Sequence, residues 1–231
     1  MSESINCLKN KLSSAHHIVY YHGWDDLLAT HLSVRVANTN KMLITPLNVP
    51  FEEVSADKII VCDLDGNILN DNGYTMMPQA INIHAEVYKR AAHIGSIMHT
   101  HSTYGLAIAS LECGFMFFNQ QALRFYDDIA YHDYNGLALD NEGVEIAESL
   151  GDKTVMILKN HGLITTGESI EQALYRLYYM EKCCELQIKT QASGQTIQPI
   201  SSEICEKTKA QFDKIAHPDF EFQALVRRVT R

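Results

Sequence analysis

Residues 32–44 read LSVRVANTNKMLI, and this stretch decides the class of fold that we expect. Leu32, Val34 and Val36 alternate with polar or charged residues. The turn-forming run 38–40 follows, and apolar residues return at 42–44. A period of two places apolar side chains on one face of a strand, and Asn-rich runs favour tight turns. The stretch therefore predicts a β-hairpin with one covered face.

Helices and further strands surround this hairpin. Asp65-Gly66 favours a second tight turn after an apolar run, Pro78 can open a helix, and Ser169 with Gln172 forms a capping box. The patterns predict helices over about 3–21, from residue 78, and over 103–110, 169–192 and 201–216, and strands over 59–62, 96–101, 115–118, 129–131 and 154–158. Residues 191–199 are the linker-like stretch before the C-terminal helix.

This order of elements predicts an α/β protein. Early hairpins, interspersed helices and the lack of βαβ repetition favour a mixed, mostly antiparallel sheet with helices on both faces. No glycine-rich loop follows a strand, which argues against a dinucleotide-binding fold. We expect one domain over residues 1–231, because chains of this length commonly fold around one core.

Composition and charge exclude some partners. The chain has 28 acidic and 19 basic residues and a net charge of −9. Nucleic-acid binding proteins cluster Lys and Arg, so no nucleic-acid partner is expected, and Arg227, Arg228 and Arg231 form a small basic end that we expect to be a solvated tail. Neither a signal peptide nor a long apolar span is present, so we expect a cytoplasmic protein without membrane contact.

The motif that could support chemistry is His99-Thr100-His101 on a predicted strand. Residues two apart on a strand project to the same face, so both imidazoles can reach one ion. His161 follows another apolar strand, in Asn160-His161-Gly162. Three histidines suit a catalytic Zn²⁺ with a fourth position open, although another divalent transition metal also fits imidazole ligands. The alternative is that these are surface or hydrogen-bonded core histidines.

Several longer motifs together resemble the class II aldolase and adducin family as far as about residue 192. They are Thr30–Arg35 (THLSVR), Met42–Pro46 (MLITP), His99–His101 (HTH) and Lys159–Leu163 (KNHGL). Gly23-Trp24 and the stretch 129–136, IAYHDYNG, are closer to adducin head domains and their bacterial relatives. The resemblance implies a three-layer α/β/α domain, zinc bound by His99, His101 and His161, and a homotetramer with sites at subunit contacts.

The chain departs from that family at its reactive positions. The resemblance places a catalytic glutamate four residues before the helix histidine, His84, and this chain has Ala80 there. Alanine can neither bind a metal nor move a proton. The positions that bind phosphate in the family are here Thr30-His31, Leu47-Asn48 and Pro78-Gln79, and no tyrosine is convincingly placed as proton donor near Gln120. We expect His84, Gln79, Gln120, His31 and Asn48 either to contact the metal ligands or to line the pocket.

Two functions follow from the resemblance. The first is a metal-binding carbon–carbon lyase that acts on a small oxygenated, unphosphorylated substrate and uses a different base, for which Asp127 and Asp128 are poor candidates. The second is a non-catalytic binding or oligomerisation module like adducin, with a cytoskeleton-type partner by resemblance only. A metal-dependent hydrolase is disfavoured, because residues 102–104 lack the aspartate that extends His-x-His in two-metal hydrolases.

Overall fold

The computed structural model describes residues 3–137 and 142–230. Within these residues seven strands form one sheet in the order β3-β2-β1-β4-β7-β6-β5. The strands are β1 His31–Arg35, β2 Lys41–Ile44, β3 Ile60–Asp63, β4 Ser96–Thr100, β5 Ile129–His132, β6 Val155–Leu158 and β7 Gly162–Gly167. The β5–β6 pair is parallel and all other neighbouring pairs are antiparallel. The mixed, mostly antiparallel sheet is thus confirmed.

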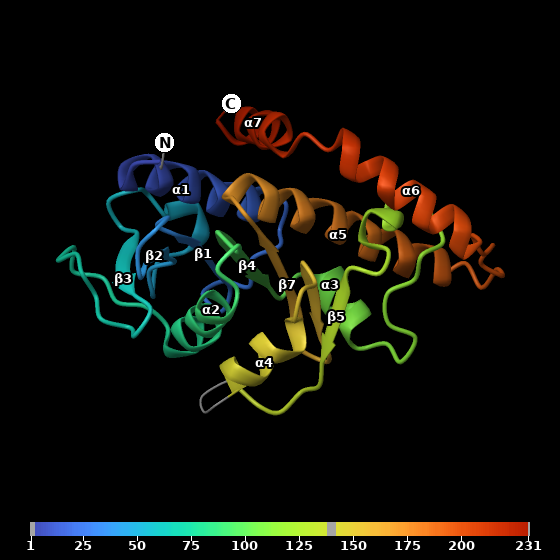
Figure 1. Cartoon of the computed structure of the whole chain (residues 1–231), viewed down its shortest axis with the longest axis horizontal. Helices are drawn as coiled ribbons and strands as arrows, with labels where there is room; N and C mark the ends of the chain where they lie inside the picture. The colour runs from blue at the N-terminus through green and yellow to red at the C-terminus, as the bar shows by residue number, and fades with distance from the viewer. Residues whose placement is uncertain (1–2, 138–141, 231) are drawn as a thin grey trace.

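Helices cover both faces of the sheet. They are α1 Ile5–Tyr21, α2 Pro78–Arg90, α3 Thr103–Ala109, α4 Glu142–Leu150, α5 Ile170–Gln191, α6 Ser202–Ile215 and α7 Pro218–Val229, with short 3-10 helices at Phe51–Glu53 and Ala122–Phe125. In Figure 1 α1, α5, α6 and α7 lie above the sheet, and α2 and α4 lie below it. None of the described helices is both long and apolar enough to cross a membrane.

Apolar side chains leave the sheet in alternate directions into separate cores. On β6, Ile157 packs with α3 and α5 and its neighbour Met156 packs with α2 and α4. On β1, Leu32 and Val34 pack toward α1 and α5. His31 and Ser33 on the opposite face of β1 are also buried, so the expectation of a single covered face was wrong. Because both faces are covered, polar side chains on β1 must find partners inside the protein.

The helical prediction was incomplete at two places. Helix α4 was not predicted, and it connects the parallel strands β5 and β6. Helix α7 was also missed: a proline can follow the end of one helix, such as that predicted over 201–216, but Pro218 is the first residue of the next. Proline is favoured at that position, where its missing N–H has no partner to lose. Arg227 and Arg228 therefore belong to the last turn of a helix and not to a tail, and Arg231 lies outside the described residues.

Two strand predictions also need correction. Residues 115–118 form no strand, and their backbone is irregular. Phe115 is buried there by packing against Phe117 and Phe125, which does not require strand pairing. Conversely, β7 was not predicted after Asn160-His161-Gly162. It pairs with both β6 and β4 and so becomes a central strand of the sheet. This pairing places the loop between β6 and β7, residues 159–161, beside the end of β4.

Candidate metal centre

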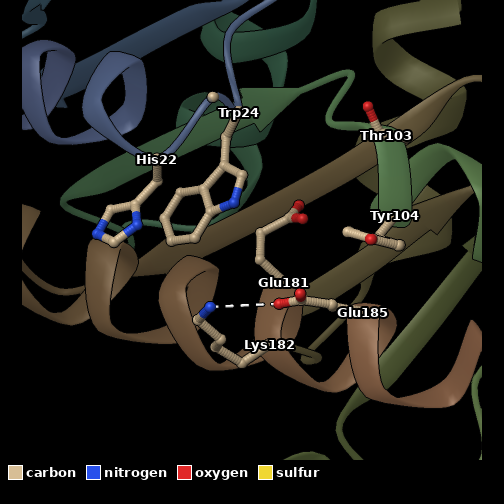
Figure 2. Close-up of a pocket in the computed structure, with 8 residues that line it drawn as sticks. His22, Trp24, Thr103, Tyr104, Glu181, Lys182 and Glu185 are labelled. Carbon is tan, nitrogen blue, oxygen red and sulfur yellow. Dashed lines mark hydrogen bonds and ion pairs between the residues drawn. The ribbon is translucent and has the colours of Figure 1, made fainter. Parts of the chain in front are cut away.

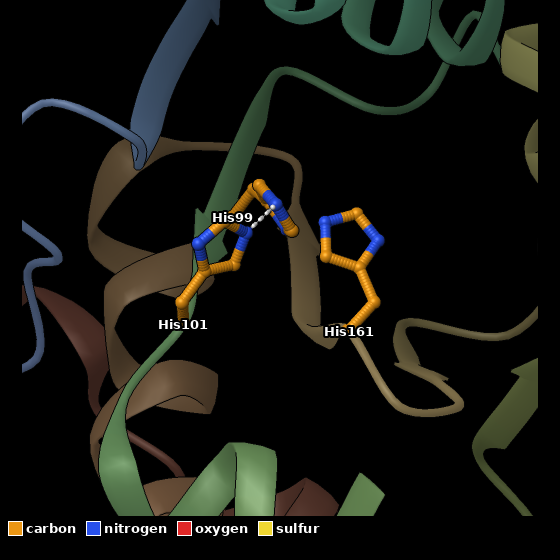
Figure 3. A group of neighbouring side chains, drawn as sticks. All are labelled: His99, His101 and His161. Carbon is orange, nitrogen blue, oxygen red and sulfur yellow. Dashed lines mark hydrogen bonds between the residues drawn. The ribbon is translucent and has the colours of Figure 1, made fainter. Parts of the chain in front are cut away.

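Three imidazoles meet at one end of the sheet (Figure 3). His99 lies on β4, His101 follows directly after that strand, and His161 is the last residue of the β6–β7 loop. The ring centroid of His99 lies 4.7 Å from that of His101 and 4.9 Å from that of His161. One ligand nitrogen from each residue lies within 4.8 Å of the others. The structure therefore brings together all three residues that the sequence indicated as candidate metal ligands.

The backbone of the loop brings His161 to this position. Asn160 has a φ of 57°, a left-handed conformation that asparagine tolerates better than most residues. Gly162 then passes so close to β4 that a Cβ atom there would lie 2.4 Å from the carbonyl oxygen of Thr100. A side chain at residue 162 would push the loop away from β4, so glycine is required for the approach.

The hydrogen bonds of His99 and His101 determine which ring nitrogen of each residue carries a proton. His99 Nδ1 lies 2.9 Å from the carbonyl oxygen of Leu163, and His101 Nδ1 lies 3.1 Å from Asp26 Oδ2. A carbonyl and a carboxylate only accept, so each Nδ1 must donate, and in the neutral form of each ring Nε2 then presents a lone pair. These two Nε2 atoms lie 2.9 Å apart. Two facing lone pairs repel each other, and a cation between or beside them removes that repulsion. The donor set therefore fits a metal ion.

Burial keeps the imidazoles of His99 and His161 neutral. The pKa of His99 is well below its usual value, first because the ring is buried and then because of its histidine neighbours, including His31. The pKa of His161 is lowered to about 4, again mainly by burial. Since a metal binds the neutral form of histidine, both rings are available as ligands at neutral pH.

A cavity of about 320 Å³ opens onto the three histidines. Its apolar wall includes Met77, Ile83 and Leu106, and its polar groups include Gln79, Tyr134 and Asn160. His31 and Asp26 also contribute to the wall. Among the described residues that line this cavity there is no Lys or Arg. Within the described lining, a ligand therefore meets imidazole rings, the Asp26 carboxylate, other hydrogen-bonding groups and apolar side chains, and no Lys or Arg.

A chain of hydrogen bonds leads from the cavity into the protein. His31 Nδ1 lies 2.8 Å from His84 Nε2, His84 Nδ1 lies 2.6 Å from Ser33 Oγ, and Ser33 Oγ lies 2.8 Å from the Tyr88 hydroxyl. His31 is opposite His99 in the β1–β4 register, with ring centroids 4.7 Å apart. Burial lowers the pKa of His84 to about 3. Each of the four groups can both donate and accept a proton.

The other predicted pocket residues divide into two groups. Gln79 and His31 line the cavity. His84 lies behind His31 and is hydrogen-bonded to it. Asn48 lies in an exposed turn and Gln120 lines a different cavity beside α6, so neither of them lines the cavity at the histidines. Ala80 is buried in the core on the α2 side of the sheet.

Asp127 and Asp128, the poor base candidates, are engaged elsewhere, with Lys153 and Thr154. Sequence reasoning missed Asp26, Ser33 and Tyr88. Two of these carried a signal: Ser33 is two residues after His31 on β1, and Tyr88 is four residues after His84 on α2.

Comparison with known proteins identifies the family. The model of the class II aldolase and adducin N-terminal domain matches residues 10–188 of this chain. The chain belongs to the class II aldolase and adducin family. The crystal structure of an aldolase II superfamily protein from Pseudomonas syringae is similar, with 30% identity and a TM-score of 0.91 over 99% of this chain and 94% of that one. The family and the α/β fold expected from the sequence are thus confirmed.

Relatives of two kinds are found within the class II aldolase and adducin family. An L-fuculose 1-phosphate aldolase from Glaciozyma antarctica has 25% identity and a TM-score of 0.87, covering 99% of this chain and 92% of that chain. Alpha-adducin from Mus musculus is 34% identical over 193 residues, which are 81% of this chain and 26% of alpha-adducin. The chain thus spans about a quarter of the length of that relative.

Proposed function

We propose that His99, His101 and His161 bind a divalent metal ion, with Zn²⁺ the first candidate, and that the protein is a carbon–carbon lyase for a small oxygenated, unphosphorylated compound. The observation that supports this best is the pair of Nε2 lone pairs 2.9 Å apart, beside a third imidazole and an open cavity. When bound, such a metal acts as a Lewis acid on a carbonyl or hydroxyl oxygen. The relationship to an aldolase supports the reaction class.

The residues around the histidines would orient ligands and substrate. Asp26 and the Leu163 carbonyl hold the rings of His101 and His99. Gln79 and Asn160 offer donors and acceptors for hydroxyl groups in the cavity. A phosphate dianion needs basic side chains or several N–H donors. The lack of Lys and Arg among the described lining residues therefore favours an unphosphorylated substrate.

His31 is the best-placed proton acceptor in the cavity. It is nearly fully buried, lies against His99, and is neutral because burial lowers its pKa well below the usual value. A proton transferred from the substrate to His31 Nε2 would stay on that ring, whose Nδ1–H is held by a hydrogen bond to His84 Nε2, with Ser33 and Tyr88 next along the same chain. His31 and the residues hydrogen-bonded to it would take the place of the carboxylate that the family has at the position of Ala80.

Metal analysis tests the first half of the proposal. Protein purified without added metal should contain about one equivalent of a transition metal, or regain it on zinc addition. His99→Ala and His101→Ala should remove most of it, and His93→Ala, which alters an exposed histidine, should not. Less than about a tenth of an equivalent in wild-type protein, unchanged by zinc, would contradict the metal site.

Turnover tests the second half. Zinc-loaded protein would be incubated with hydroxy-carbonyl compounds of four to six carbons, each with and without a phosphate group, and released aldehyde would be measured. We expect cleavage of an unphosphorylated member, and its loss on chelation and in His31→Ala. Cleavage of phosphorylated members alone would contradict the substrate class that we propose.

A non-catalytic role like that of adducin is the second candidate. The likeness to alpha-adducin and the burial of Ala80 favour it. This candidate includes a homotetramer and a cytoplasmic, cytoskeleton-type partner. Exposed apolar residues close to the cavity support contact between copies, because Leu27 is 70% and Leu137 is 69% exposed. A tetrameric mass in light scattering, cosedimentation with cytoskeletal filaments and no turnover with zinc would favour this role over the lyase.

A further inference from the structure

A second cavity, of about 220 Å³, shares no lining residue with the cavity at the histidines. It is formed by the loop after α1, the start of α3 and the middle of α5 (Figure 2). Trp24 and Tyr104 stand on either side, and the carboxylate of Glu181 points into the space between them. The volume corresponds to roughly seven water molecules, at about 30 Å³ each, so it admits only a small ligand.

Glu181 is the unusual residue in this cavity. It is 2% exposed, and one carboxylate oxygen accepts a hydrogen bond from Ser102 Oγ. The other oxygen, Oε2, is buried and has no hydrogen-bond partner among the described residues. Buried carboxylates are normally paired or fully hydrogen-bonded, because removing their charge from water is unfavourable. The described residues therefore leave this buried acceptor without a donor, which a ligand that reaches it would supply.

Neighbouring charges do not compensate Glu181 directly. Lys182 and Lys189 both pair with Glu185, at 3.2 and 2.6 Å, and neither forms an ion pair with Glu181 within the described part of the chain. Burial is the main cause that lowers the pKa of His22 to about 4, and the charges of Lys182 and Arg228 lower it further, so this ring is uncharged at neutral pH.

Aromatic rings form much of the wall of this cavity, which the ion-paired Lys182 and Glu185 also line. The ring of His22 stacks on Trp24, with centroids 4.5 Å apart and an interplanar angle of 14°. Tyr104 closes the opposite side. Aromatic faces attract cations, most strongly where water is excluded. The cavity thus combines one carboxylate without an ion-pair partner with aromatic walls.

We propose that this cavity binds a small organic monocation with a primary ammonium group, whose counterion is the carboxylate of Glu181. An ammonium group has three N–H donors. Glu181, Thr103 and Tyr104 line the cavity, and their carboxylate and hydroxyl oxygens are possible acceptors. A bound metal ion fits less well. The group of potential metal ligands found among the described residues is the histidine group at the other cavity.

Trp24 is the one tryptophan of the chain, so its fluorescence reports on this cavity directly. Ethylammonium chloride would be titrated into the full-length protein at pH 8, in a buffer without amines, with sodium chloride at matched ionic strength as the reference. We expect a saturable change in emission with a Kd in the millimolar range. Tetramethylammonium has the same charge but no N–H donor, so it should bind at least about tenfold more weakly.

Variants decide whether Glu181 is responsible. Glu181→Gln should weaken ethylammonium binding at least about tenfold. Glu203→Gln removes an equal charge from an exposed position on α6 and should bind as wild type does. If Glu181→Gln does not fold, Tyr104→Leu, which keeps the carboxylate and removes a wall, should weaken binding several-fold. His99→Ala should bind ethylammonium normally, so the outcome is independent of the metal site.

No saturable change up to about 100 mM ethylammonium, where even a weak millimolar site is filled, would overturn the proposal. Equal affinity in wild-type protein and Glu181→Gln, or equal affinity for tetramethylammonium, would overturn it as well.

Discussion

Glu181→Gln should change how the stability of the protein depends on pH. Burial raises the pKa of Glu181 from its ordinary value of 4.5 to about 7, so the folded protein binds this proton more tightly than the unfolded chain does. Stability contributed by this group is therefore present at low pH and is lost as the pH rises from 4.5 through about 7. At about 1.4 kcal/mol per pH unit, the loss between pH 5 and pH 8 is about 2–3 kcal/mol.

Glutamine keeps the acceptor for Ser102 and cannot ionise, so the variant should escape this loss. The free energy of unfolding would be measured by urea denaturation of both proteins at pH 5, 6, 7 and 8, at one protein concentration and without amine buffers. The difference between variant and wild type should shift in favour of the variant by about 2–3 kcal/mol across this range. Other titrating groups are common to both proteins and cancel in the comparison.

A difference that stays constant with pH would refute this reasoning, because it would mean that Glu181 remains ionised in the folded protein at pH 5. Glu203→Gln on the exposed face of α6 is the matched control, and its difference from wild type should not vary by more than about 0.5 kcal/mol. Adding ethylammonium should raise the stability of wild-type protein at pH 8 and leave Glu181→Gln unchanged.

Further predictions concern the metal centre and the backbone around it. Asp26→Asn removes the carboxylate that orients a proposed ligand, so zinc affinity, measured by competition with a chelator, should fall about 10–100-fold with the fold retained; unchanged affinity would exclude this role. Gly162→Ala should destabilise the protein by more than about 2 kcal/mol in urea, because its Cβ would clash with the Thr100 carbonyl, whereas Gly194→Ala meets open space and should lose about 1 kcal/mol. Ser169→Ala removes the N-cap hydrogen bond of α5 and should reduce stability by about 1 kcal/mol, and a loss below about 0.3 kcal/mol would contradict the capping prediction.

Local sequence patterns predicted the elements that are defined by short-range physics. The alternation at 32–44 gives the β1–β2 hairpin, and Pro78 and Ser169 begin helices where the capping rules place them. Pro218 shows the limit of such rules, since proline both follows one helix and begins the next. Phe115 was assigned to a strand because it lies in an apolar run, but burial by aromatic neighbours does not require strand pairing.

The site shows a similar division. Spacing was sufficient to nominate His99 and His101, because side-chain direction along a strand is a local property. Asp26 contacts His101 from a distant loop, and no pattern within either segment could indicate this. Glu181 lies on the apolar stripe of α5, where the sequence gives no sign that its second oxygen is left unpaired. Contacts between distant segments depend on the whole fold, and therefore required the structure.

The β4–β7 pairing has a consequence for the order of folding. His101 and His161 are 60 positions apart in the sequence. They are brought together where β4 pairs with β7 and Gly162 packs against Thr100. Closing a chain loop of this length is slow compared with forming helices or hairpins. We therefore expect the three histidines to come together late in folding, so that a metal that binds them would slow unfolding more than it speeds folding. Removal of such a metal would then shorten the lifetime of the native protein, a property that equilibrium stability alone does not report.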